Sequence, residues 1–285
     1  METKKEEIPQ YLYHYTNVDS LALILKNRSI RLNSLDKMDD LQEQISDDRQ
    51  NFGRFVFVSS WTADSKESIP MWRMYTPKQR GVRIKLSSNP FVEYSLGAKN
   101  IARIMGIPYD GNGADDIGFK TIIPTSELFD KNYFLQNYSI GNQLVQVKYT
   151  NDKSILEPNV LQITGENFSV NVGKLGIHKN SYWEFQKEWR YRLLFMPLSI
   201  QNMIKEHMQG KNNEMLNMQS QIVMGQAMLP FNYSDLSIRD ECFEEMSIML
   251  APDISESAKI CIELLVKEYN SKCVIEESEL TSLLQ

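Results

Sequence analysis

Residues 188–193 alternate strictly between charged and apolar side chains. In order they are Glu188, Trp189, Arg190, Tyr191, Arg192 and Leu193. Successive side chains of a β-strand point to opposite faces of the sheet, so this pattern predicts a strand with one charged and one apolar face. A chain that contains such a strand must supply a core on one side of a sheet and polar partners on the other.

Further strand-like and helix-like segments are spread along the whole chain. The segments with strand character are 30–32, 55–58, 82–86, 144–149, 246–250 and 273–275, and those with helical spacing begin after Thr16, Ser34, Ser68 and Ser255. Pro70 suits the first turn of the helix after Ser68. The strand, helix and strand between 246 and 275 form a βαβ-like unit. The pattern predicts an α+β fold.

Two regions depart from this regular pattern. Glycine and aspartate residues predict a loop-rich insertion near 88–140. Six methionines among many amides predict a helical excursion near 200–230 with an adaptable apolar face; they are Met203, Met208, Met215, Met218, Met224 and Met228. No internal repeat or low-complexity linker divides the chain, so we expect one domain over residues 1–285.

Composition narrows the classes of function. The net charge is −6 and the isoelectric point about 5.3, so the sequence predicts no basic surface for duplex nucleic acid, although a local basic groove stays open. Three late cysteines without CxxC spacing argue against a disulfide framework and against a metal site. No segment approaches the roughly 20 apolar residues of a membrane span. We expect a soluble, cytoplasmic protein without a bound metal.

Three separated segments each place a polar or ionisable side chain beside aromatic rings. They are residues 13–16, 71–75 and 183–190. A dinucleotide pocket needs both kinds of group, because ribose hydroxyls require hydrogen-bond partners and flat heterocycles stack on rings. The sequence has three histidines, and His14 lies between two tyrosines. The three segments therefore predict parts of one dinucleotide pocket.

The chain also resembles the DUF2971 family in these and neighbouring segments. The resemblance lies in residues 11–16, 38–43, 57–61, 71–75, 81–84, 187–190 and 249–252, and in the amphipathic helix that follows. That family is distantly similar to the ADP-ribosyltransferase superfamily. The resemblance implies NAD as co-substrate and a single ADP-ribosyltransferase-like domain with a split β-sheet core and flanking helices.

The resemblance implies roles for seven side chains. His14, Tyr15, Thr16, Ser60 and Trp72 would bind NAD, and Tyr75 and Glu188 would serve catalysis. Within this set, His14 would bind a ribose hydroxyl, and Tyr75 with Trp72 would stack a ring. Cleavage of the N-glycosidic bond of NAD builds positive charge on the ribose, which a carboxylate such as Glu188 stabilises.

Ordinary structural roles stay open for each of these residues. His14 fits a packed imidazole bonded to a backbone group, and Thr16 fits a helix N-cap. Trp72 and Tyr75 lie three apart on a helix and fit a buried face of the core. Ser60 fits a turn at the end of a strand.

Glu188 has both a rival and a structural alternative. Glu184 lies four residues earlier, but the context Lys187-Glu188-Trp189-Arg190 is the one that matches the family. The structural alternative for Glu188 is an exposed salt bridge to Arg190 or Arg192, which contributes little to stability.

One segment departs from the family pattern. The family usually has Asn-Asp-Pro-x-Glu where this chain has Asp39-Asp40-Leu41-Gln42-Glu43. Asp39 adds a carboxylate that repels phosphates. Asp40 and Glu43 fit either a solvated face or groups that orient the catalytic residues or the acceptor.

The sequence-based hypothesis is an NAD-dependent ADP-ribosyltransferase that modifies a macromolecular acceptor, either a protein or a nucleic acid (DNA or RNA). The resemblance also implies a toxin or anti-phage effector, with an antitoxin or other protein as partner. Two alternatives stay open. One is an NAD glycohydrolase, and the other is a non-catalytic binding module that engages a partner through residues 203–228.

Overall fold

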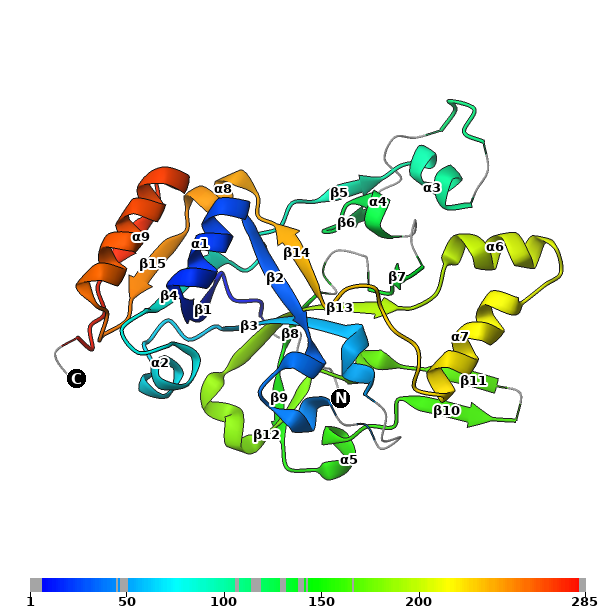
Figure 1. Cartoon of the computed structure of the whole chain (residues 1–285), viewed down its shortest axis with the longest axis horizontal. Coiled ribbons are helices and arrows are strands. Elements are labelled where there is room, and N and C mark those ends of the chain that lie inside the picture. The colour runs from blue at the N-terminus through cyan, green and yellow to red at the C-terminus, as the bar shows by residue number, and fades with distance from the viewer. Residues whose placement is uncertain are drawn as a thin grey trace.

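A mixed β-sheet with helices on both sides organises the chain (Figure 1). The computed structural model describes residues 7–44, 46, 51–105, 108–113, 119–128, 132–137, 141, 143–165 and 167–281. Within these residues the main sheet has ten strands. They are β1 (Tyr11–Asn17), β2 (Ser29–Ser34), β3 (Val56–Thr62), β4 (Gly81–Ser87), β7 (Phe134–Leu135), β8 (Leu144–Gln146), β13 (Glu188–Met196), β14 (Tyr233–Ser237), β15 (Ser247–Leu250) and β16 (Val274–Glu276).

The remaining strands form three two-stranded sheets. These are β5 (Tyr94–Leu96) with β6 (Phe119–Thr121), β9 (Lys148–Thr150) with β12 (His178–Asn180), and β10 (Leu161–Thr164) with β11 (Asn167–Val170). The α-helices are α1 (Val18–Asn27), α2 (Ile69–Tyr75), α3 (Ala98–Met105), α4 (Thr125–Leu128), α5 (Lys153–Leu156), α6 (Ile200–Met208), α7 (Asn213–Val223), α8 (Asp240–Glu244) and α9 (Glu256–Tyr269). Short 3-10 helices are η1 (Leu35–Lys37), η2 (Leu41–Gln44), η3 (Phe52–Phe55), η4 (Val172–Lys174) and η5 (Ser181–Gln186). The expected mixture of helices and strands is confirmed.

The sheet forks at β3. On one edge β3 pairs with β13 over its full length, from Thr62 opposite Glu188 to Val56 opposite Leu194. Its other edge pairs with β2 at Val58 and with β1 at Thr62. Both β1 and β2 therefore meet the same edge of β3 at different points, and they diverge from it. β1 continues into β4, β15 and β16, whereas β2 continues into β14.

Apolar side chains fill both sides of the sheet. One core cluster joins β1, β4 and β15 to helices α1 and α9, which lie side by side in Figure 1. A second cluster joins β3 and the end of β13 to α7 and η3. A small third cluster consists of Tyr15, Trp72 and Ala251, with Tyr75 and Leu280 packed against it.

Several local expectations are confirmed. Ser68 caps α2, accepting a hydrogen bond from the backbone N–H of Met71, and Pro70 lies in the first turn. Residues 247–276 form the expected strand, helix and strand, with β15 and β16 parallel. The methionine-rich region does form two helices, α6 and α7.

Other local expectations are wrong. The N-cap of α1 is Asn17, which accepts from the N–H of Ser20, whereas Thr16 is buried in β1. On β4, Arg83 is buried against Tyr13 and Tyr15, whereas Lys85 is half-buried. The expected strand at 144–149 is two short strands separated at Val147.

The insertion near 88–140 lies only partly within the described residues. There it contains β5, α3, β6, α4 and β7 joined by loops. In the described ranges, no helix combines the length and apolar character that a membrane crossing requires.

Candidate functional site

A cleft with a cavity volume of about 110 Å³ lies where β1, β3 and β13 meet. Its walls come from five separate parts of the chain. The lining residues are Tyr13, His14 and Tyr15 of β1; Met38, Asp39, Asp40 and Glu43 after β2; Ser60 and Trp61 of β3; Met71 and Tyr75 of α2; and Lys179, Trp183, Gln186, Glu188 and Arg190 near β13. The three segments chosen from sequence thus contribute to one cleft.

His14 bridges the fork in the sheet. Its Nδ1 lies 2.8 Å from the backbone carbonyl oxygen of Ser60, and its ring packs 5.0 Å from that of Trp61. A carbonyl oxygen only accepts, so Nδ1 carries the proton and Nε2 is the acceptor nitrogen. Burial lowers the pKa of His14, and the hydrogen bond to Ser60 opposes this only in part. His14 is therefore a neutral imidazole that can accept a hydrogen bond from a hydroxyl group.

Tyr75 is held at the cleft by a chain of hydrogen bonds. The side-chain amide of Gln186 donates to the Tyr75 hydroxyl, and the Gln186 oxygen accepts from Lys179 Nζ at 3.0 Å. Burial raises the pKa of Tyr75, and the carboxylate of Glu188 raises it further. The hydroxyl therefore keeps its proton and can donate it in a hydrogen bond.

Glu188 belongs to a buried set of four charges, Glu43, Lys179, Glu188 and Arg190, which we call the charged cluster. Arg190 Nε lies 2.6 Å from Glu188 Oε1, and Lys179 Nζ lies 2.8 Å from Glu188 Oε2. Arg190 also contacts both oxygens of Glu43, at 2.5 and 2.9 Å. Arg190 thus binds two carboxylates with one planar guanidinium group.

The charged cluster fixes the ionisation of Glu188 and Arg190. Burial by itself would raise the pKa of Glu188, but Arg190 and Lys179 outweigh it and hold the pKa well below its usual range. Burial would lower the pKa of Arg190, but Glu188 and Glu43 outweigh it and raise the pKa. Glu188 is therefore a permanent carboxylate and a poor proton acceptor.

A second hollow, with a cavity volume of about 290 Å³, adjoins the first and shares His14, Met38 and Ser60 with it. It lies between β1 and β2, and residues of α1 also line it. Hydroxyl and amide side chains dominate its polar lining, and Thr16 is among them. At its edge Arg31 pairs with Asp235, both contacts being 2.8 Å.

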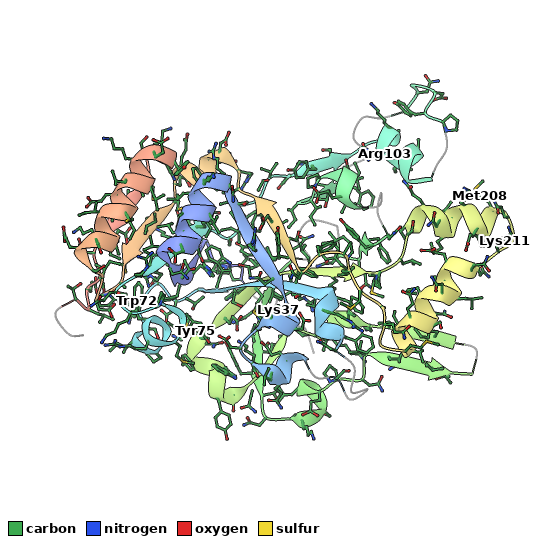
Figure 2. The ribbon with its side chains drawn as sticks, in the orientation of Figure 1. Lys37, Trp72, Tyr75, Arg103, Met208 and Lys211 are labelled. Atoms are coloured by element: carbon green, nitrogen blue, oxygen red, sulfur yellow. The ribbon has the colours of Figure 1, made fainter. Side chains whose placement is uncertain are left out.

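The structure separates the two aromatic residues expected to stack a ring. Tyr75 lines the cleft together with Met71, four residues earlier on α2. Trp72 does not line the cleft, which corrects the expectation. It is buried behind the cleft, where it packs edge-on against Tyr15 and donates to Glu67 at 2.8 Å. Figure 2 labels Trp72 and Tyr75 on α2.

The other candidates also have definite positions. Tyr15 and Ser60 line the cleft. Glu184, the rival of Glu188, is exposed and does not line the cleft. The salt bridge considered between Glu188 and Arg190 is present, but it is buried and not exposed, because the whole of β13 is buried.

Glu43 and Asp40 line the cleft too. The solvated face considered for Glu43 is wrong, because only 5% of this residue is exposed. Asp40 is half-buried, and its Oδ1 accepts from the backbone N–H of Gln42. Asp39 is exposed.

Sequence reasoning missed Lys179 and Gln186. Gln186 lies inside the segment 183–190 that combines polar and aromatic side chains, two residues before Glu188, so its position could have drawn attention. Lys179 carries no such signal, because its role depends on carboxylates that the fold brings to β12. No known protein-family model, curated protein or solved structure matches the chain.

Proposed function

We propose that the protein is an NAD-dependent ADP-ribosyltransferase that modifies a macromolecular acceptor. The observation that carries the proposal is the meeting of His14, Tyr75 and Glu188 in one cleft, although they lie on β1, α2 and β13. The resemblance to the DUF2971 family supplies NAD as the ligand. With a macromolecular acceptor, the protein would act as a toxin or anti-phage effector in the cytoplasm, and a protein partner would inhibit it.

In this proposal His14 and Tyr75 bind and orient NAD. Nε2 of the neutral His14 accepts a hydrogen bond from a ribose hydroxyl, and the hydrogen bond to Ser60 keeps the ring in that orientation. The ring of Tyr75 offers a stacking surface, and its hydroxyl, fixed by Gln186, offers a hydrogen-bond donor. These contacts would hold the nicotinamide ribose above the charged cluster.

Glu188 would then favour cleavage. The bond between C1′ of the ribose and the nicotinamide nitrogen breaks, and its electron pair leaves with nicotinamide, which becomes neutral. The sugar carries the positive charge until an acceptor nucleophile bonds to C1′ and releases its proton to solvent. A preorganised carboxylate stabilises that charge without having to move or change protonation.

The pairing of Glu188 favours a second function, a non-catalytic binding module. Arg190 and Lys179 contact both of its oxygens, as expected for a structural ion pair. An open cleft nevertheless lies beside this pair. As such a binding module, the protein would bind NAD without cleaving it.

Incubation of the protein with NAD labelled in the adenylate moiety and with cell lysate tests the proposal. Label that becomes covalently attached to protein or nucleic acid supports the transferase and identifies the acceptor class. Release of free labelled ADP-ribose alone would indicate an NAD glycohydrolase. Binding by calorimetry without consumption of NAD would indicate the binding module, and absence of both would overturn the proposal.

A further inference from the structure

The charged cluster contains equal numbers of positive and negative groups in a buried place. Exposed fractions are 5% for Glu43, 7% for Lys179, 2% for Glu188 and 1% for Arg190. Two carboxylates and two cations give a net charge of zero. Such a balance matters because charges in a protein interior are screened far less than at the surface.

Within the cluster, Glu188 alone would not balance its neighbours. Its single carboxylate faces both Arg190, at 2.6 Å, and Lys179, at 2.8 Å. Glu43 supplies the second negative charge, with contacts of 2.5 Å to Arg190 and 3.7 Å to Lys179. Without Glu43, the charged cluster would carry one net positive charge, while Asp39 and Asp40, which also line the cleft, lie outside the cluster.

A positively charged cluster beside the bound ring would oppose the chemistry proposed for the cleft. The nicotinamide ring of NAD is a cation, and the ribose becomes one as the glycosidic bond breaks. Like charges within about 4–6 Å disfavour each other strongly in a buried site. NADH differs in this respect, because its reduced ring is neutral.

We propose that Glu43 is a positioning residue that neutralises the charged cluster, so that the cleft accepts the cationic ring of NAD and Glu188 can stabilise the cationic ribose. This inference rests on the proposed function. Glu43 acts through Arg190, whose guanidinium it shares with Glu188, and it also holds Arg190 in the geometry that Glu188 needs. The charge of the cluster then sets the preference for NAD over NADH.

Three variants of the full-length protein change the cluster charge in known steps. Glu43→Gln makes it +1, Lys179→Gln makes it −1, and the double variant returns it to zero with the Glu188–Arg190 pair intact. Glu184→Gln is the matched control, since it removes an exposed carboxylate outside the cleft. For each variant, NAD and NADH affinities are measured by calorimetry, NAD cleavage by kcat and KM, and folding by thermal unfolding.

We expect Glu43→Gln to lower kcat on the order of 10²-fold, as loss of a preorganised electrostatic group does. It should also weaken NAD more than NADH. Lys179→Gln should raise the ratio of NAD to NADH affinity, and the double variant should return this ratio and most of kcat toward wild type. The Glu184→Gln control should match wild type throughout.

Rescue separates charge balance from a merely structural role. If the double variant is as inactive as Glu43→Gln, or if the NAD to NADH ratio is the same in every variant, the inference is overturned. If Glu43→Gln does not fold, the ratio must still rise in Lys179→Gln and fall back in the double variant. A wild-type protein that neither binds nor cleaves NAD overturns the proposed function together with this inference, whereas an active wild type without rescue overturns only the inference.

Discussion

Replacement of Glu188 by glutamine tests the buried ion pairs and the proposed chemistry together. The side chain keeps its size, but its negative charge is lost. The charged cluster then holds one carboxylate, Glu43, against the two cations Arg190 and Lys179. An exposed pair would make this change nearly neutral for stability, but 2% exposure of Glu188 makes it costly.

The expected loss of stability follows from the burial. Removal of one partner from a buried ion pair costs about 3–5 kcal/mol, because an uncompensated charge stays inside. For 285 residues, an unfolding entropy of about 2.1 cal/mol/K per residue gives roughly 0.6 kcal/mol/K. The midpoint of thermal unfolding should therefore fall by about 5–8 °C.

The expected loss of activity is separate from the loss of stability. Loss of one preorganised electrostatic group typically slows a reaction by about 10²–10³-fold, or roughly 3–4 kcal/mol of barrier. NAD cleavage is measured at a temperature where unfolding curves show the variant to be folded. Glu184→Gln, the exposed neighbour, serves as control for both measurements and should equal wild type.

The stability and the activity of Glu188→Gln can each contradict these expectations independently. A midpoint within about 1 °C of wild type would mean that the buried ion pairs contribute nothing, contrary to the cost of a buried unpaired charge. Unchanged turnover of NAD in a folded Glu188→Gln protein would remove Glu188 from the mechanism. Loss of turnover in Glu184→Gln with retention in Glu188→Gln would show that the wrong carboxylate was assigned.

Three further predictions concern pH, metal and mobility. Burial lowers the pKa of His14 below its usual value of about 6.5, so NAD affinity should be constant from pH 8 to about 6.5 and fall only at lower pH, where protonation removes the acceptor nitrogen. In calorimetric titrations, His14→Gln should abolish that fall. A fall in affinity centred at pH 7 or above contradicts the assignment. EDTA should leave NAD affinity unchanged, since none of the described residues form a His, Cys, Asp and Glu cluster suited to a metal; weaker binding after chelation would refute this. Amide hydrogens of residues 203–228 should exchange faster than those of β3 and β13, because Met208, Met224 and Met228 are largely exposed; equally slow exchange would contradict it.

The position of the methionine-rich segment bears on the binding-module alternative. Met208 and Lys211 lie at the far right of Figure 2, well away from Tyr75, which lines the cleft. Met218 is buried against the second core cluster, and Met203 and Met215 pack beside it. The segment therefore forms part of the hydrophobic core. Apolar residues at helical spacing predict packing against a core as well as they predict binding of a partner.

Interactions between residues close in sequence allowed much of the secondary structure of this protein to be predicted. The alternation at 188–193 required a strand with two unlike faces, and β13 has them. Ser68 and Pro70 marked the start of α2, because a hydroxyl satisfies a free backbone N–H and proline lacks one. The spacing of residues 246–275 gave the parallel strands and helix at the end of the chain. Each of these features depends on neighbours a few residues apart.

Tertiary structure alone decided what the charged face of β13 meets. Arg190 contacts Glu43, 147 residues away along the chain, and this contact turns a strand face that resembles solvent-exposed surface into a buried ion-pair cluster. The side of α2 that faces the cleft was likewise undecided, because Trp72 and Tyr75 lie close together around the helix and either fits a core or a pocket. Periodicity specifies which side chains share a face, but not what covers that face, since the covering residues come from segments distant in sequence.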